Sequence, residues 1–314
     1  MSAVTESYLK VHYELRPAKQ VERRMMMDAF QRMNAAGFQL SDYQYTGFGS
    51  VYFIDFSLLH KFLGIRRMLS VEHSPKVRNR VYFNKPYDLV EIEIASISDV
   101  IPRLSRDRKH ILWLDYDDML NADQLSDLSL SCAQLSPGSI LLVTVDAEPP
   151  VKNGSPSEWC EHFRQEARDL FNIRWSATDF KESLLVRRNI DILSNAIQQG
   201  LAGRAEITFH PIFNFLYADG HRMLTIGGVI GTESDERMLR ACHFERVHYT
   251  RTNLRYEPFR IEVPHVTRKE RLYLDAAMPC ADGWTPSEFE MDWPKVQAYR
   301  DIYRFFPAYA EMML

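Results

Sequence analysis

The hydrophobic positions of this chain alternate between helix-like and strand-like spacing in a regular order. Residues 16–33 place apolar side chains at intervals of three and four, with Pro17 where a helix would begin. Shorter apolar or alternating runs follow, separated by amphipathic segments. The expected strands lie within residues 39–50, which end in a glycine turn, and within 66–73, 88–96, 110–120 and 139–150. The expected helices between them lie within residues 51–64, 74–87, 97–107 and 121–138.

Strands that alternate with helices predict a parallel sheet covered on both faces. Two further helical segments precede two strands joined at Asp219-Gly220, a pair typical of hairpin turns. We therefore expect an α/β fold: a doubly wound, mostly parallel, seven-stranded sheet closed by an antiparallel hairpin. The expected organisation is an N-terminal helical segment (1–39), a Rossmann-like core (40–232) and a mainly helical C-terminal extension (233–314).

Composition narrows the class of protein. The chain has 314 residues, 46% of them hydrophobic, and a net charge of −4, which favours a globular protein without a general affinity for polyanions. Four scattered cysteines without CxxC spacing indicate neither a zinc site nor a disulfide framework. With no signal-peptide pattern and no long apolar run, we expect a cytoplasmic protein that does not enter a membrane.

Polar residues collect just after the expected strands, where doubly wound sheets bind ligands. Glycines there let backbone amides approach a ligand, and an acid about 20 residues later can hold the two hydroxyls of a ribose. Glu72 lies 23 residues after Gly49, which favours a cofactor-binding bend over a simple tight turn. The candidate cofactor-binding residues are Gly47, Phe48, Gly49, Ser50, Glu72, His73, Ser96, Ile97, Ser98 and Asp115.

With GFGS after the first strand, SVEH at the second, LDYDD at the fourth and a closing hairpin, residues 40–232 resemble the class I S-adenosylmethionine-dependent methyltransferases. The resemblance implies that Gly47, Gly49 and Ser50 lie near the methionine moiety of this cofactor. It also implies Glu72 on the ribose, Ser96–Ser98 by the adenine, and Asp115–Asp117 at the reacting centre. The third strand ends in IASIS, without the acid usual in that superfamily.

The acidic end of the fourth strand is more similar to small-molecule O-methyltransferases than to the Asn/Asp-Pro-Pro-Tyr/Phe motif of amino-group DNA methylation. The candidate catalytic residues are Asp115, Tyr116 and Asp117, with Asp115 or Asp117 as the base for an unidentified acceptor. A divalent cation on Asp115 and Asp146 is a less favoured alternative, so no metal site is assigned. Asp117 and Asp118 can instead cap the following helix, and Tyr116 can serve packing.

Three other features have two interpretations each. The stripe of Arg16, Lys19 and Arg23 can meet a carboxylate, a phosphate or a nucleic-acid backbone, although a solvated or salt-bridged stripe is the commoner case. Basic and aromatic residues interleave in 246–260, which makes nucleic-acid binding possible but disfavoured. The aromatic C-terminal tail packs on the main domain or meets a partner protein or second copy.

The sequence thus supports two functional hypotheses from different classes. The leading hypothesis is an enzyme that uses S-adenosylmethionine to methylate an oxygen of a small or medium-sized acceptor. The alternative is a non-catalytic module that keeps this fold for binding or assembly in a multiprotein system. A third reading, an NAD-dependent oxidoreductase, ranks lower because the third glycine of its motif is absent.

Overall fold

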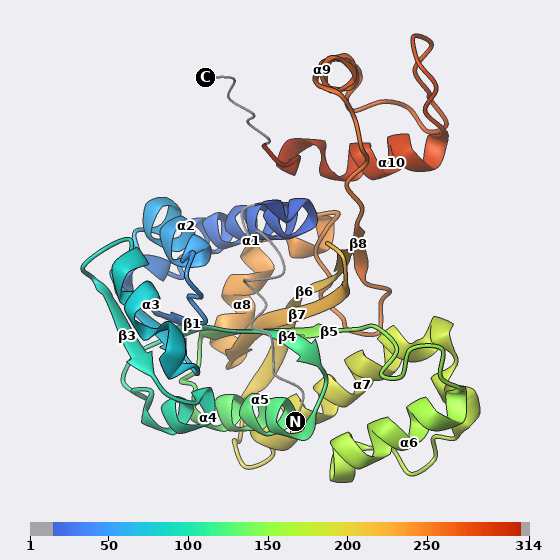
Figure 1. Ribbon diagram of the computed structural model, residues 1–314. Helices are drawn as coiled ribbons and strands as arrows, with labels where there is room; N and C mark the ends of the chain where they lie inside the picture. Colours follow the sequence, from blue (N-terminus) through green and yellow to red (C-terminus); the bar gives the residue numbers. More distant parts are fainter. Residues whose placement is uncertain (1–14, 309–314) are drawn as a thin grey trace.

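The computed structural model describes residues 15–308, and its centre is a sheet of eight strands (Figure 1). The sheet order is β3-β2-β1-β4-β5-β7-β6-β8. The first five strands pair in parallel, β7 lies antiparallel between β5 and β6, and β8 runs parallel to β6. The strands are β1 (Gln44–Gly47), β2 (Arg67–Glu72), β3 (Val90–Ile94), β4 (His110–Met119), β5 (Ser139–Asp146), β6 (Thr208–Ala218), β7 (Arg222–Gly231) and β8 (Phe259–Ile261).

This arrangement confirms the predicted fold class and adds one strand to it. The order reverses at β1, which lies between β2 and β4, so the sheet has the switch point expected of a doubly wound fold. The extra strand, β8, has only three residues. A segment that short has too few positions for a period of two to be recognised.

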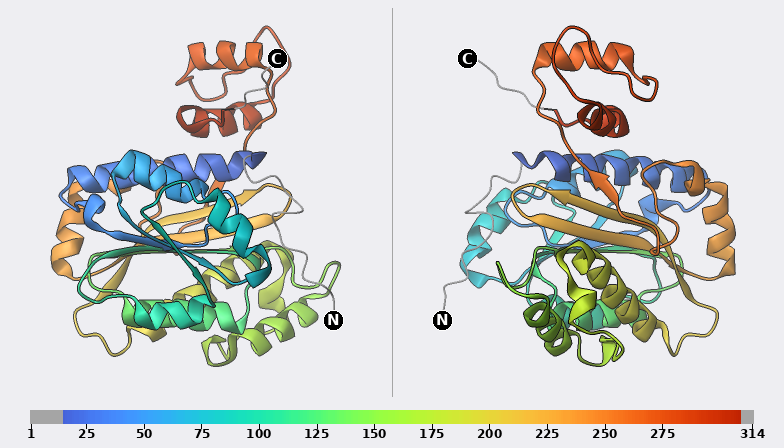
Figure 2. Two further views of the ribbon diagram at one scale, coloured as in Figure 1. Left: turned by 60° about the vertical axis from the view of Figure 1, so that its left-hand side comes forward. Right: turned by 90° about the vertical axis from the view of Figure 1, so that its right-hand side faces the viewer.

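Helices cover both faces of the sheet, and each face has its own apolar core (Figures 1 and 2). On one face lie α1 (Pro17–Ala35), α2 (Ile54–Leu63), α3 (Arg78–Asn84) and α8 (Glu233–Ala241). On the other lie α4 (Ile97–Val100), α5 (Ala122–Gln134), α6 (Pro156–Ala167) and α7 (Glu182–Leu201). None of the helices in 15–308 is long and apolar enough to cross a membrane.

The β6–β7 hairpin holds the start of α1. Ala218 pairs with Arg222 across a three-residue turn, in which Gly220 takes a φ of +99° that favours glycine. The Asp219 carboxylate in this turn accepts the backbone N–H groups of Ala18 and Lys19 at 3.0 and 2.9 Å. These are donors that the first turn of a helix leaves without helical partners, so a residue 200 positions away caps α1.

The C-terminal part lies above α1, with α10 (Trp293–Ile302) nearer to that helix and α9 (Arg268–Ala277) on the far side of α10 (Figures 1 and 2). Tyr299, Phe305 and Phe306 are buried, and the Phe305 ring lies 5.4 Å from that of Tyr249. Arg24 of α1 donates to the carbonyl of Phe306. These aromatic residues therefore pack within the chain; the last tail residues, 309–314, lie outside the described part. The division into 1–39, 40–232 and 233–314 stays a prediction.

Candidate functional site

The carboxyl ends of β1, β2 and β4 bring three predicted residues to one rim of the sheet. Gly47 pairs with Ser70 in β2 and with Trp113 in β4. Two residues further along each strand direction come Gly49, Glu72 and Asp115. Since paired positions in parallel strands share a level, these residues lie at the same rim, at the switch point of the sheet.

The glycine turn after β1 is packed too closely for side chains. A Cβ atom at Gly47 would lie 2.6 Å from Tyr45 Oη, and one at Gly49 would lie 2.3 Å from Ser70 Oγ. Ser50 and Phe53 adopt positive φ values of 50° and 49°, which few non-glycine residues do. Glycine is therefore required at both positions for the turn to adopt this path. The turn itself lies at the rim.

The end of β2 supplies one half-buried carboxylate. Glu72 accepts the backbone N–H of Ser74 at 2.9 Å, which fixes one of its oxygens. The neighbouring His73 is exposed. Of this pair, only Glu72 is held in a defined position by a contact in the structure.

Consecutive residues of β4 face opposite sides of the sheet. Trp113 belongs to the core beneath α1, whereas Leu114 belongs to the core beside α5. With the alternation of a strand, Asp115 follows Trp113 and Tyr116 follows Leu114. The predicted catalytic residues are thus divided between two environments.

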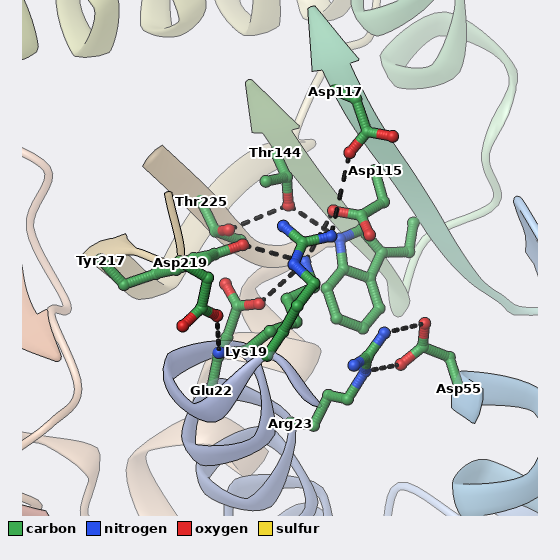
Figure 3. A network of polar contacts seen from close by, with 12 residues as sticks. Lys19, Glu22, Arg23, Asp55, Asp115, Asp117, Thr144, Tyr217, Asp219 and Thr225 are labelled. Atoms are coloured by element: carbon green, nitrogen blue, oxygen red, sulfur yellow. Dashed lines mark hydrogen bonds and ion pairs between the residues drawn. The ribbon is translucent and has the colours of Figure 1, made fainter. Parts of the chain in front are cut away.

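On the α1 side, Lys19 occupies the centre of a buried charged network (Figure 3). Its Nζ lies 2.7 Å from Asp115 Oδ1, 2.9 Å from Glu22 Oε2 and 3.1 Å from the Tyr217 hydroxyl. The ammonium also lies 4.5 Å from the centre of the Trp113 ring. The Lys19 and Glu22 side chains have no exposed surface, so one cation between two carboxylates compensates their burial.

The network sets the protonation of its members. Burial opposes the charge of Lys19, but Asp115 and Glu22 hold its pKa above the ordinary value. Burial would also raise the pKa of Asp115, but Lys19 and Arg16 hold it below its ordinary value. For Glu22, burial dominates and raises the pKa, with Lys19 offsetting only part of the effect. Asp115 therefore remains ionised, and Glu22 takes up a proton more readily than a free glutamate.

The other two residues of the α1 basic stripe also meet carboxylates. The Arg16 guanidinium lies 4.0 Å from Asp117, and Arg23 Nε lies 2.6 Å from Asp55 Oδ1 at the start of α2. Of the favoured expectation, a solvated or salt-bridged stripe, the salt-bridged form is the one found: all three cations meet carboxylates within the chain. Sequence spacing placed the cations on one face, but it gave no sign of which acids they would meet.

On the α5 side, hydroxyl groups surround a buried carboxylate. Asp127 of α5 is 3% exposed, and it accepts from the Ser98 hydroxyl at 2.6 Å and the Tyr116 hydroxyl at 2.8 Å. The Tyr116 ring lies 5.4 Å from that of Phe48 in the glycine turn. Ser96 accepts the backbone N–H of Ser98 at the start of α4. Three of the predicted cofactor segments therefore meet here.

This second cluster also shifts its pKa values. Burial raises the pKa of Asp127, and hydrogen bonds from Ser98 and Tyr116 offset part of the rise. Burial and the neighbouring Asp127 raise the pKa of Tyr116, so its hydroxyl stays protonated. Sequence analysis missed Asp127. The sequence offered one sign of it: Asp127 shares a helix face with Leu128 and Ser131, and these residues are buried in the structure.

The remaining predictions near β4 have mixed outcomes. Asp117 and Asp118 are exposed strand residues, and α5 is capped by Asn121 and Gln124 instead, so the capping interpretation is wrong. The Asp146 carboxylate accepts the N–H of Glu148 at 2.7 Å. Within residues 15–308, no three potential ligand side chains gather closely enough to form a metal-binding group.

The basic and aromatic segment 246–260 is largely part of the fold. Tyr249 and Phe259 are buried, and the Tyr249 hydroxyl donates to Asp28 at 2.6 Å. Tyr256 alone of its three aromatic rings remains exposed. Two of the rings that would stack on bases are therefore committed to the core.

A family model described as "Putative O-methyltransferase" matches residues 11–314. The chain belongs to this family. The predicted resemblance to the class I S-adenosylmethionine-dependent methyltransferases is thereby confirmed. No curated protein matches the sequence.

Solved structures similar to this chain are distant from it. The O-methyltransferase TomG from Streptomyces achromogenes, in complex with S-adenosylmethionine, is 14% identical, with 68% of this chain and 88% of that chain covered and a TM-score of 0.36. A protein from Klebsiella pneumoniae described as "a putative O-methyltransferase" is 10% identical, with coverages of 65% and 90% and a TM-score of 0.36. The Methanococcus jannaschii pre-rRNA processing protein fibrillarin is 9% identical, with coverages of 61% and 68% and a TM-score of 0.36.

Proposed function

We propose that this methyltransferase transfers the methyl group to an oxygen atom of a small or medium-sized acceptor. The observation that carries the proposal is the strand register that brings Gly49, Glu72 and Asp115 to one rim. When bound, S-adenosylmethionine supplies a methyl group on a positively charged sulfur. The residues at that rim would bind the cofactor and the acceptor and orient them for transfer.

The groups present at the rim are suited to this cofactor. Glu72 is half-buried and offers carboxylate oxygens to ribose hydroxyls, with one of them oriented by Ser74. Gly47 and Gly49 are buried, and side chains there would collide with Tyr45 and Ser70, so glycine is needed for the turn to keep this path at the rim. Hydroxyls at Ser98 and Tyr116 lie on the neighbouring segments, where a base would sit.

The acidic end of β4 divides the work of catalysis in this proposal. Asp115 is held ionised by Lys19, so it suits an acceptor hydroxyl as a hydrogen-bond partner and attracts the positive sulfur. Its lowered pKa makes it a weak base. Tyr116 keeps its proton, so it does not serve as a base either. Asp117 is exposed and can pass an acceptor proton to water.

Calorimetry with S-adenosylmethionine tests the cofactor part of this assignment. Glu72→Ala should weaken binding about 10- to 100-fold, the equivalent of hydrogen bonds to a charged group. Glu91→Ala is the matched control, because Glu91 is an exposed carboxylate on the adjacent strand β3. Equal affinity of both variants and the parent chain would remove Glu72 from the site.

The non-catalytic alternative rests on a separate observation: Lys19 already occupies the side of Asp115 that faces α1. A binding module with this fold would show no heat with the parent chain at millimolar S-adenosylmethionine. An enzyme would bind the cofactor and release S-adenosylhomocysteine when supplied with phenolic and carboxylic acceptors, which mass spectrometry detects. Measuring S-adenosylmethionine binding and then S-adenosylhomocysteine release with these acceptors therefore distinguishes the two functional hypotheses.

A further inference from the structure

The cluster around Asp127 joins three segments that are far apart in the sequence. Tyr116 comes from the end of β4, Ser98 from the start of α4, and Phe48 from the turn after β1. Asp127 of α5 accepts one hydroxyl on each of its two carboxylate oxygens: Ser98 on Oδ1 and Tyr116 on Oδ2. A single buried side chain thus fixes the orientation of two hydroxyl groups.

The direction of these hydrogen bonds decides what the hydroxyls can offer to a ligand. A hydroxyl has one proton to donate and two lone pairs to accept with. Both protons point to the carboxylate of Asp127, so the free lone pairs of Ser98 and Tyr116 are acceptors only. Both side chains are half-buried rather than enclosed, which leaves part of each accessible.

The purine of the cofactor carries a group of the matching kind. The 6-amino group of adenine donates hydrogen bonds, whereas the 6-oxo group of hypoxanthine accepts them. The third strand ends without an acid, as Ala95 and Ser96 follow Ile94, so the end of that strand supplies no carboxylate to accept from the amino group.

We propose that Asp127 is a positioning residue for base recognition: it holds the Ser98 and Tyr116 hydroxyls as acceptors, and these select adenine through its 6-amino group. This inference rests on the proposed function, because it requires the cofactor's base to lie beside Ser96–Ser98. Asp127 itself acts through the two hydroxyls and does not touch the ligand. The purely structural alternative is that Asp127 only ties α5 to α4 and β4.

The test compares S-adenosylhomocysteine with S-inosylhomocysteine, in which a 6-oxo group replaces the 6-amino group and N1 carries a proton, by calorimetry on the full chain. The parent should prefer the adenosyl compound by about 10- to 100-fold, the worth of one or two hydrogen bonds. Asp127→Asn should reduce this preference about tenfold. The reason is that the new amide donates to one hydroxyl, which frees that hydroxyl's proton to meet the 6-oxo group.

Three further variants make the outcome decisive. Asp123→Asn, an exposed aspartate one turn earlier on α5, should keep the parent's preference. Ser98→Ala and Tyr116→Phe each remove one acceptor and should weaken the adenosyl compound more than the inosyl compound. They also serve if Asp127→Asn does not fold.

The ratio of the two affinities is the informative readout, because a general loss of stability lowers both binding constants alike. An unchanged ratio in Asp127→Asn, or in both hydroxyl variants, refutes base selection while leaving the proposed function intact. Absence of binding of either compound to the parent chain refutes the proposed function together with this inference.

Discussion

Asp115 and Tyr116 are neighbours in the chain but belong to two different polar environments on opposite faces of the sheet. Asp115 lies beneath α1 in a network of full charges centred on Lys19 (Figure 3). Tyr116 lies beside α5 in a cluster of hydroxyls around one carboxylate. In the first, opposite charges compensate desolvation; in the second, hydrogen bonds do so. The comparison shows that one strand end can carry two different polar environments, because successive residues of a strand face different helices.

The largest effect should come from removing the cation of the charged network. Lys19→Met keeps most of the side-chain length but removes the cation that lies between the buried Glu22 and the partly buried Asp115. We expect the free energy of unfolding to fall by about 3–5 kcal/mol, measured by chemical denaturation. Lys61→Met, at an exposed position of α2, should change it by less than about 0.5 kcal/mol. A loss near zero in Lys19→Met would mean that water reaches the two carboxylates.

A smaller effect is expected in the hydroxyl cluster. Tyr116→Phe keeps the ring against Phe48 but removes one of the two donors to the buried Asp127. The expected loss is about 1–3 kcal/mol in the same denaturation measurement. Since Asp127 retains Ser98, this loss should stay below that of Lys19→Met. The reverse order would contradict the distinction between a charged and a hydrogen-bonded face.

The smallest effect concerns pH and has a definite sign. The pKa of Glu22 is raised in the folded state, so folding favours its protonated form. The free energy of unfolding therefore falls as the pH rises from the pKa of Glu22 in the unfolded chain through its pKa in the folded chain. Asp115 has the opposite sign: its pKa is lowered, and its contribution is lost only as the pH falls through the folded value. Glu22→Gln mimics the protonated form. It should therefore reduce the loss of stability that occurs as the pH rises, and leave the loss at low pH, which is due to Asp115, unchanged.

At pH 8 we expect Glu22→Gln to be more stable than the parent chain, because the pKa of Glu22 is raised by burial. At pH 4 the two chains should be similar in stability. Denaturation midpoints measured across this range provide the comparison. A variant less stable than the parent at pH 8 would show that the ion pair with Lys19 outweighs the burial of Glu22.

Much of the fold was predictable because local patterns agree with it. The helix begun by Pro17, the alternation of β3 and the Asp-Gly turn at Asp219 each follow from residues close in the sequence. The rim residues were predictable for the same reason, since they lie near the carboxyl ends of β1, β2 and β4. Their cofactor roles remain predictions, because the contacts in the structure establish position and not binding.

The sequence by itself determined the order of helices and strands, the polar strand ends and the shared face of Arg16, Lys19 and Arg23, because these depend on spacing within one segment. Only the tertiary structure decided that Lys19 meets Asp115, that Asp219 caps α1 and that Asp127 meets Tyr116. Those pairs join segments up to 200 residues apart. Their partners are chosen by packing and by the need to compensate buried charge, and neither leaves a periodic signal in the chain.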